Sequence, residues 1–185
     1  SWYHYPAIKD PIKIIKKPDI IYISHIHGDH YDPIFLKKLL SKYPKAKIII
    51  PEFKLNYLYL KSKFDGINVK PTSYLKRKGI NINIISNEED KTDIDSAIVV
   101  NDGQFTVLGL VDCVYNKNFF VKVKKILNKY TKKVDLMMIP HSGANSFPHT
   151  YFDFVTEKKK LKINETIKKK KNIDRYLQWC SLFNS

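Results

Sequence analysis

His25-Ile-His-Gly-Asp-His30 gathers three of the chain's six histidines into six residues. The stretch follows Asp19–Ser24, a β-branched apolar run that predicts a buried strand. In extended backbone, His25 and His27 share one face, and Gly28 permits the tight turn that brings Asp29 and His30 round. Imidazole nitrogen and carboxylate oxygen suit zinc or iron. The stretch therefore predicts a metal site, with His25 and His27 for one ion and Asp29 and His30 for a second. The alternative is a surface loop that merely happens to hold three histidines.

The rest of the chain alternates short strands and helices, which indicates an α/β class. Asp32-Pro33 opens the first helix, because Asp is a good N-cap and Pro suits the first turn. We see no domain boundary, so residues 1–185 are expected to form one domain. Strands are expected at 19–24, 45–50, 68–72, 80–86, 94–101, 104–110 and 134–139. Helices are expected from Asp32 through Leu40, at 53–64, at 119–130 and, strongly basic, over 156–185 with a break near Lys171. Asp102-Gly103 is expected to join two of these strands as a two-residue hairpin turn.

The formal charge of +15 would be consistent with a nucleic-acid partner. However, all but two of the 33 basic residues are lysine, the exceptions being Arg77 and Arg175. Lysine lacks the rigid fork of donors used in base and phosphate recognition. We therefore expect no specific nucleic-acid binding, whereas a small anionic substrate stays compatible with the charge. Two cysteines and no apolar run near the ~20 residues of a membrane span lead us to expect a cytoplasmic chain without a membrane segment.

The pattern H-x-H-x-D-H after an apolar strand resembles the signature of the metallo-β-lactamase superfamily. Much of the remaining chain resembles one branch of it, the hydrolase-like domain of CMP-N-acetylneuraminate hydroxylase and its bacterial relatives. The resemblance implies a four-layer αβ/βα sandwich, truncated here at both ends. The segments that carry it are Trp2–Pro6, Ile21–His30, Phe35–Leu39, Asp95–Val100, Val111–Cys113, Leu136–Met138 and Ser142–Pro148.

Carried over by position, the resemblance makes Asp112 the carboxylate that bridges two metals. The alternative is an ordinary turn carboxylate after Leu108–Val111. The neighbouring Cys113 is expected to be a buried small residue, not a ligand. In the implied hydrolysis, metal lowers the pKa of a bound water to roughly 7. Asp29 would orient or deprotonate that water, which makes Asp29 and Asp112 the expected catalytic residues.

Two ligands of the superfamily pattern are missing. A further histidine is expected before Asp95, but 86–95 contains none, so Asp93 or Asp90 is a candidate substitute. The remaining histidines, His141, His149 and His4, are weaker candidates, and a loop histidine bonded to backbone is the alternative for each. The final strand and its ligand are also absent. We therefore expect an incomplete domain with an under-coordinated site, which would aggregate or need a partner chain or oligomer.

These observations lead to a metal-dependent hydrolase acting through metal-bound hydroxide. The expected substrate is a phosphodiester, nucleotide-sugar or lactone, in sialic acid or surface-glycan metabolism. The expected cofactor is zinc, as one or two ions, with iron or manganese as alternatives. One rival is a degenerate metal-binding domain that partners a separate oxygenase, since the chain has no Rieske motif of its own. The other rival is a metal-dependent nuclease, suggested by the positive charge.

Overall fold

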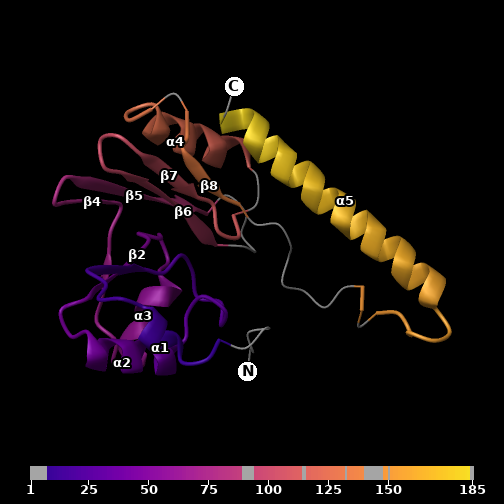
Figure 1. Ribbon diagram of the computed structural model, residues 1–185, viewed down its shortest axis with the longest axis horizontal. Coiled ribbons are helices and arrows are strands. Elements are labelled where there is room, and N and C mark those ends of the chain that lie inside the picture. The colour runs from indigo at the N-terminus through magenta and orange to yellow at the C-terminus, as the bar shows by residue number, and fades with distance from the viewer. Residues whose placement is uncertain are drawn as a thin grey trace.

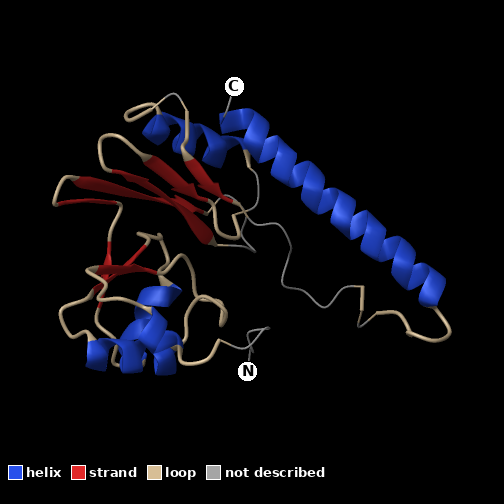
Figure 2. Ribbon diagram, in the orientation of Figure 1, coloured by secondary structure: helices blue, strands red, loops and turns tan. Residues whose placement is uncertain are grey.

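The computed structural model describes residues 8–88, 94–113, 116–131, 133–139, 148–149 and 151–183. These residues form a mixed α/β fold with two sheets and helices on the outer side of each (Figures 1 and 2). The α/β class expected from the sequence is therefore confirmed.

The first sheet is parallel, with strand order β1-β2-β3. Its strands are β1 (Ile20–Tyr22), β2 (Lys47–Ile50) and β3 (Val69–Pro71). Helices α2 (Pro33–Lys42) and α3 (Tyr57–Phe64) connect them, preceded by the short α1 (Pro11–Ile14). The apolar residues of β2 and β3 pack with those of α2 and α3 into one core cluster. Its buried members are Ile23, Tyr31, Leu36, Ile48, Ile50, Leu58, Ile67 and Val69.

The second sheet has five strands in the order β4-β5-β6-β7-β8. They are β4 (Tyr74–Arg77), β5 (Ile80–Asn87), β6 (Asp95–Asn101), β7 (Thr106–Gly109) and β8 (Leu136–Met138). The pairs from β4 to β7 are antiparallel, and β8 runs parallel to β7. The strand β4 was not expected. It pairs with β5 through a turn at Lys78 and Gly79, whose positive φ angles of 48° and 81° suit a tight hairpin.

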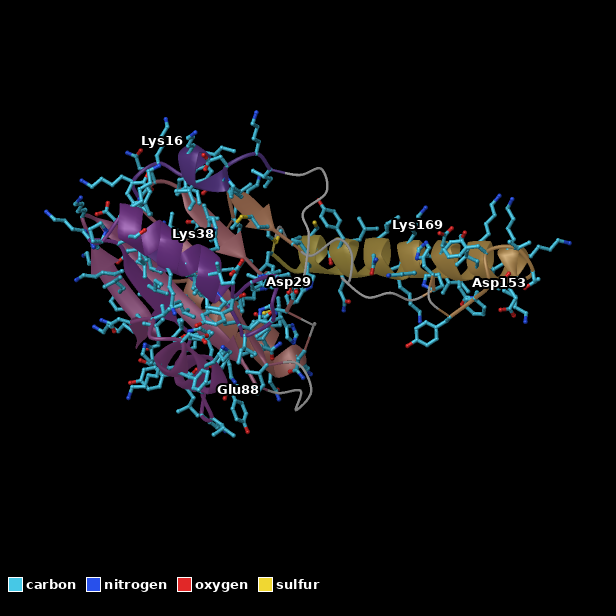
Figure 3. All side chains as sticks on the ribbon, turned by 90° about the horizontal axis from the view of Figure 1, so that it is seen from below. Lys16, Asp29, Lys38, Glu88, Asp153 and Lys169 are labelled. Atoms are coloured by element: carbon cyan, nitrogen blue, oxygen red, sulfur yellow. The ribbon has the colours of Figure 1, made fainter. Side chains whose placement is uncertain are left out.

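Helix α4 (Lys117–Leu127) lies against the outer face of the second sheet, and the C-terminal end of α5 (Lys158–Phe183) lies beside α4 (Figure 1). Only the C-terminal end of α5 joins this core, through Trp179 and Phe183, while most of the helix projects from the body (Figure 3). The expected break near Lys171 is wrong, because α5 is one helix of 26 residues. No helix within the described ranges is long and apolar enough to cross a membrane.

A third core cluster contains residues of both sheets. Ile49 of β2 and Ile82 and Ile84 of β5 are its buried members. Ile20 and Tyr22 of β1 pack against it from the first sheet. The two sheets therefore share an apolar contact, and the C-terminal end of β1 comes close to the second sheet.

Two local expectations need correction. The loop between β6 and β7 spans 102–105, not two residues, because Asn101 pairs with Thr106. The Asp102 carboxylate accepts the N–H groups of Gln104 at 2.9 Å and Phe105 at 2.7 Å and so stabilises the longer loop. Helix α3 begins at Tyr57 rather than at residue 53, because the Asn56 side chain caps it by accepting the Tyr59 N–H at 3.0 Å.

Candidate metal centre

The histidine loop leaves the C-terminal end of β1, next to the second sheet. Backbone bonds from the N–H groups of His30 (3.0 Å) and Tyr31 (2.8 Å) to the His27 carbonyl close it into a tight turn. Asp32 then caps α2 by accepting the Ile34 N–H at 2.9 Å and the Phe35 N–H at 3.0 Å. The loop is thus fixed by a strand before it and a capped helix after it.

His25 is the buried centre of this loop, with 2% of its surface exposed. Its Nε2 lies 2.9 Å from Nδ1 of His27, and its ring centroid is 4.3 Å from that of His30. Three imidazoles therefore crowd one side of the loop. Asp29 is next to them, with its carboxylate 3.5 Å from Nε2 of His30.

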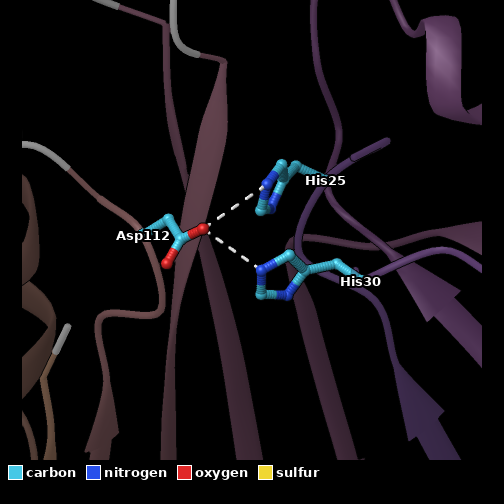
Figure 4. A group of neighbouring side chains, drawn as sticks. All are labelled: His25, His30 and Asp112. Carbon is cyan, nitrogen blue, oxygen red and sulfur yellow. Dashed lines mark hydrogen bonds and ion pairs between the residues drawn. The ribbon is translucent and has the colours of Figure 1, made fainter. Parts of the chain in front are cut away.

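Asp112 reaches the same place from the second sheet, after the end of β7. Its Oδ2 lies 3.1 Å from Nε2 of His30 and 3.9 Å from Nε2 of His25 (Figure 4). One ligand atom from each of these three residues lies within 4.8 Å of the others, a grouping that could hold a metal ion. The predicted placement of Asp112 is thus found. Its role as a bridging ligand, and those of His27 and Asp29 as further ligands, stay predictions.

The donor chemistry of this group fits a divalent metal. Two imidazole nitrogens and a carboxylate oxygen from different loops face one point, which is the ligand set zinc and iron favour. Burial would lower the pKa of His25, but hydrogen bonding to Asp95 and the charges of Asp95, Asp112 and Asp29 outweigh it and raise that pKa. The surroundings thus favour positive charge at this point.

Sequence reasoning missed Asp95, the first residue of β6. It is buried, and one carboxylate oxygen lies 3.2 Å from Nδ1 of His25. We had interpreted Asp95 only as part of a strand. The signal that could have found it is an acidic residue at the start of an otherwise apolar buried strand, because a buried carboxylate needs partners.

Of the other residues considered from the sequence, His149 and Cys113 lie in the described part of the chain and do not join the group. Nε2 of His149 lies 2.7 Å from Oε1 of Glu165 on α5, so this histidine pairs with the projecting helix. Cys113 is buried among apolar side chains, and burial raises the pKa of its thiol, as expected of a core residue. His4, Asp90, Asp93 and His141 lie outside the described residues.

Two cavities border the histidine loop. One of about 160 Å³ lies beside His27 and is lined by Ile26, His27, Phe53, Leu55, Tyr57, Leu58 and Ile94. The other, of about 630 Å³, lies beside Asp29 and His30, and its remaining lining is largely apolar side chains of α1, β1 and α2. Among the residues that the structure describes, no lysine or arginine lines either cavity.

Comparison with known families gives one match. The model of the CobW/HypB/UreG nucleotide-binding domain matches residues 71–174, which is more than half of the chain. Because the match is this long, the chain belongs to this family. The match does not agree with the metallo-β-lactamase resemblance. The chain also contains no Gly-x-x-x-x-Gly-Lys-Ser/Thr sequence, with which P-loop proteins bind phosphates. The match therefore identifies no nucleotide site here, and the histidine loop remains the chemically informative feature.

Curated relatives are similar over most of the chain. Cytidine monophosphate-N-acetylneuraminic acid hydroxylase of Sus scrofa is 28% identical over 158 residues, covering 81% of this chain and 34% of the relative. The inactive human counterpart (Homo sapiens) is also 28% identical, with 81% of this chain and 29% of the relative covered. The chain thus spans about a third of the length of these relatives.

Solved structures give a likeness in fold. A CmlA β-hydroxylase variant, E377D, superposes with a TM-score of 0.53 at 15% identity, over 78% of this chain and 32% of that one. The metallo-β-lactamase fold protein YhfI from Bacillus subtilis gives a TM-score of 0.48 at 17% identity, over 69% of this chain and 50% of that one. The similarity to the CmlA variant supports the fold of this chain and says nothing about its activity.

Proposed function

We propose that this chain is a metal-dependent hydrolase domain of the metallo-β-lactamase type. The observation that carries the proposal is the convergence of His25, His30 and Asp112 from two different sheets. Two imidazoles and a carboxylate that two different loops bring within reach of one point are the donor set that a shared metal ion needs. The histidine motif and the similarity to the hydroxylase relatives support the same conclusion.

The proposed architecture is the four-layer sandwich, as one domain over 1–185. Three core clusters support it: α2 and α3 on the first sheet, the two sheets against each other, and α4 with the end of α5 on the second sheet. The proposed site then lies at one end of the contact between the sheets, where loops from both sheets meet.

In the proposed site His25, His27, Asp29, His30 and Asp112 hold zinc, as one or two ions, with iron or manganese as alternatives. A bound metal would acidify water and polarise the electrophile. Asp29, whose carboxylate lies 3.5 Å from Nε2 of His30, would orient or deprotonate that water. The contact between the Asp112 carboxylate and His30 holds the loop after β7 next to the histidines.

The residues that line the two cavities beside the histidine loop favour one of the three expected substrate classes. A phosphodiester or nucleotide-sugar carries negative charge that is usually bound by lysine or arginine. The described residues that line the two cavities beside the histidine loop include no lysine or arginine, and the lining of the larger cavity is mostly apolar with Asp29 and Asp32 in it. A lactone or ester with an apolar substituent therefore fits these cavities better than the two anionic classes do.

The test has two readouts. The purified chain would be loaded with zinc, manganese or iron and its metal content measured, and then assayed on a lactone, a phosphodiester and a CMP-sugar. We expect at least one ion per chain and hydrolysis of the lactone. The variant His30→Ala should lose both, while His149→Ala, a histidine paired with Glu165 outside the group, should keep both. Metal binding that is equal in the two variants would contradict the proposal.

A second candidate is a metal-binding domain that serves a separate oxygenase. The similarity to hydroxylases favours it, because the chain spans only part of those proteins and lacks a Rieske motif. Metal binding without hydrolysis of any substrate class in the same assay would support this candidate over the first.

A further inference from the structure

Asp95 makes contacts with both halves of the candidate metal centre. Its Oδ1 lies 3.2 Å from Nδ1 of His25, and its Oδ2 accepts the backbone N–H of Asp112 at 3.1 Å. Its Oδ1 also accepts the N–H of Ser96 at 2.6 Å. Only 4% of the Asp95 surface is exposed. One buried carboxylate thus faces the histidine loop and the Asp112 loop together.

We propose that Asp95 is the positioning residue of this centre, orienting His25 on one side and the Asp112 turn on the other. The proposal rests on the metal site proposed above and adds a residue that is not itself a ligand. Carboxylates that accept the second N–H of a ligating histidine fix its tautomer and its ring orientation.

The contacts of His25 define the tautomer that Asp95 would select. A carboxylate is only an acceptor, so a proton on Nδ1 makes the approach of Asp95 favourable. Nε2 is then free of a proton and faces His27, His30 and Asp112. Ser24 Oγ also lies 2.9 Å from Nδ1 and can accept from the same N–H.

The scaffold behind Asp95 is itself hydrogen-bonded. Ser96 Oγ donates to the Ser24 carbonyl at 2.9 Å, which ties the start of β6 to the residue before His25. The Tyr22 hydroxyl lies 2.6 Å from Ser96 Oγ, and burial raises the pKa of that phenol far above its usual range. The Asp95 carboxylate is therefore held in place by both sheets.

The backbone turn just before Asp112 explains why the Asp112 loop needs a hydrogen-bond acceptor. Val111 has a φ of 49°, a left-handed conformation that β-branched residues rarely adopt. The bond from the Asp112 N–H to Asp95 stabilises the turn that follows it. Without this acceptor, the turn would be free to relax and carry the Asp112 carboxylate away from His30.

The first test needs no substitution. Long-range ¹H–¹⁵N spectra of the metal-free chain, recorded at a pH where the ¹⁵N shifts themselves show a neutral His25 ring, report which nitrogen of His25 carries the proton. We expect Nδ1–H in the wild type and a shift toward Nε2–H in Asp95→Asn. A wild-type His25 with its proton on Nε2 would overturn the proposal, whether or not the chain binds metal.

The second test is the zinc affinity of folded Asp95→Asn. We expect a loss of about 10–100-fold, the usual effect of removing such a partner. Asp135→Asn is the matched control, because the Asp135 carboxylate also accepts a backbone N–H in this sheet, that of Thr106 at 2.7 Å. The control should bind zinc within about twofold of the wild type. Equal affinities for the two variants would overturn the proposal. A wild type without zinc affinity would instead overturn the proposed function. The role of Asp95 would then be decided by the tautomer of His25 measured in the first test.

Discussion

Tyr31 shows how one side chain next to the histidine loop ties it to a distant helix. Its buried hydroxyl donates to Oδ2 of Asp65 at 2.8 Å, just beyond the end of α3. Lys61, one turn earlier in α3, holds the other oxygen of the same carboxylate. Burial and the bond to Asp65 raise the pKa of Tyr31 to about 12, so the phenol stays a donor over the whole physiological range.

A pH-dependent stability follows from Asp65. Hydrogen bonding to Lys61, then to Tyr31, holds the pKa of Asp65 below its ordinary value. An acid with a lowered pKa in the folded chain stabilises it above the unfolded pKa, and this stabilisation is lost as pH falls through the folded pKa. Urea unfolding of wild type and Asp65→Asn should therefore differ most above the ordinary Asp pKa of about 3.9, and the two should converge as pH falls through the lowered pKa of Asp65. A difference that stays constant over this range would show that Asp65 acts by packing alone.

Among the elements, α2 is the one whose start bears directly on the site. Asp32 caps α2 two residues after His30, and Pro33 occupies its first position. Fraying this end would free the chain next to His30, because the helix start and the tight turn are continuous.

The cap gives a matched pair of variants. Asp32→Ala and Asn56→Ala each remove the N-cap of a helix that packs on the first sheet, and each should cost about 1 kcal/mol of unfolding free energy. Only Asp32→Ala should also weaken metal binding, since Asn56 does not adjoin a candidate ligand. Denaturant titrations and metal titrations on both variants check this. If Asn56→Ala weakens metal binding as much, the effect is one of global stability.

The elements that could be predicted from sequence were those with strong local signals. The strand before His25 and the helix after Asp32 carry such signals, and both are present, although the strand is shorter than expected, at Ile20–Tyr22, and half-buried rather than buried. Strand β4 was missed because Tyr74–Arg77 alternates only weakly and is mostly exposed. It exists through its pairing with β5, which no local pattern specifies.

The candidate site, like the fold, could be predicted from the sequence only in part. The histidine loop was evident because its residues are adjacent, and Asp112 was placed by resemblance to a family. The partnership of Asp95 with His25 depends on how β6 of one sheet lies against β1 of the other, which is set by the apolar contact between the sheets. Such a long-range arrangement has no signature in the spacing of residues.

On the scale of the whole molecule, the proposed ligands lie on both sides of the contact between the sheets. His25 and His30 lie in the loop that follows β1 of the first sheet, and Asp112 lies in the loop that follows β7 of the second. Among the described residues, the core cluster at that contact has only three buried apolar members, Ile49, Ile82 and Ile84. A metal ion held by both sides would therefore join the two halves of the fold, and its binding energy would appear as stability of the entire chain.

This coupling predicts a stabilisation by zinc that needs both sheets. At a free zinc concentration of about 100 times Kd, binding to the folded state alone contributes about 2.7 kcal/mol. For a chain of this size, that corresponds to a rise in Tm of roughly 5–10 °C. Thermal unfolding by circular dichroism should show this rise for the wild type and little of it for Asp112→Ala, which keeps every proposed ligand of the first sheet. Magnesium, which prefers six oxygen ligands, should give no comparable rise. If zinc stabilises Asp112→Ala as strongly as the wild type, the ion is held by the histidine loop alone and does not join the two sheets.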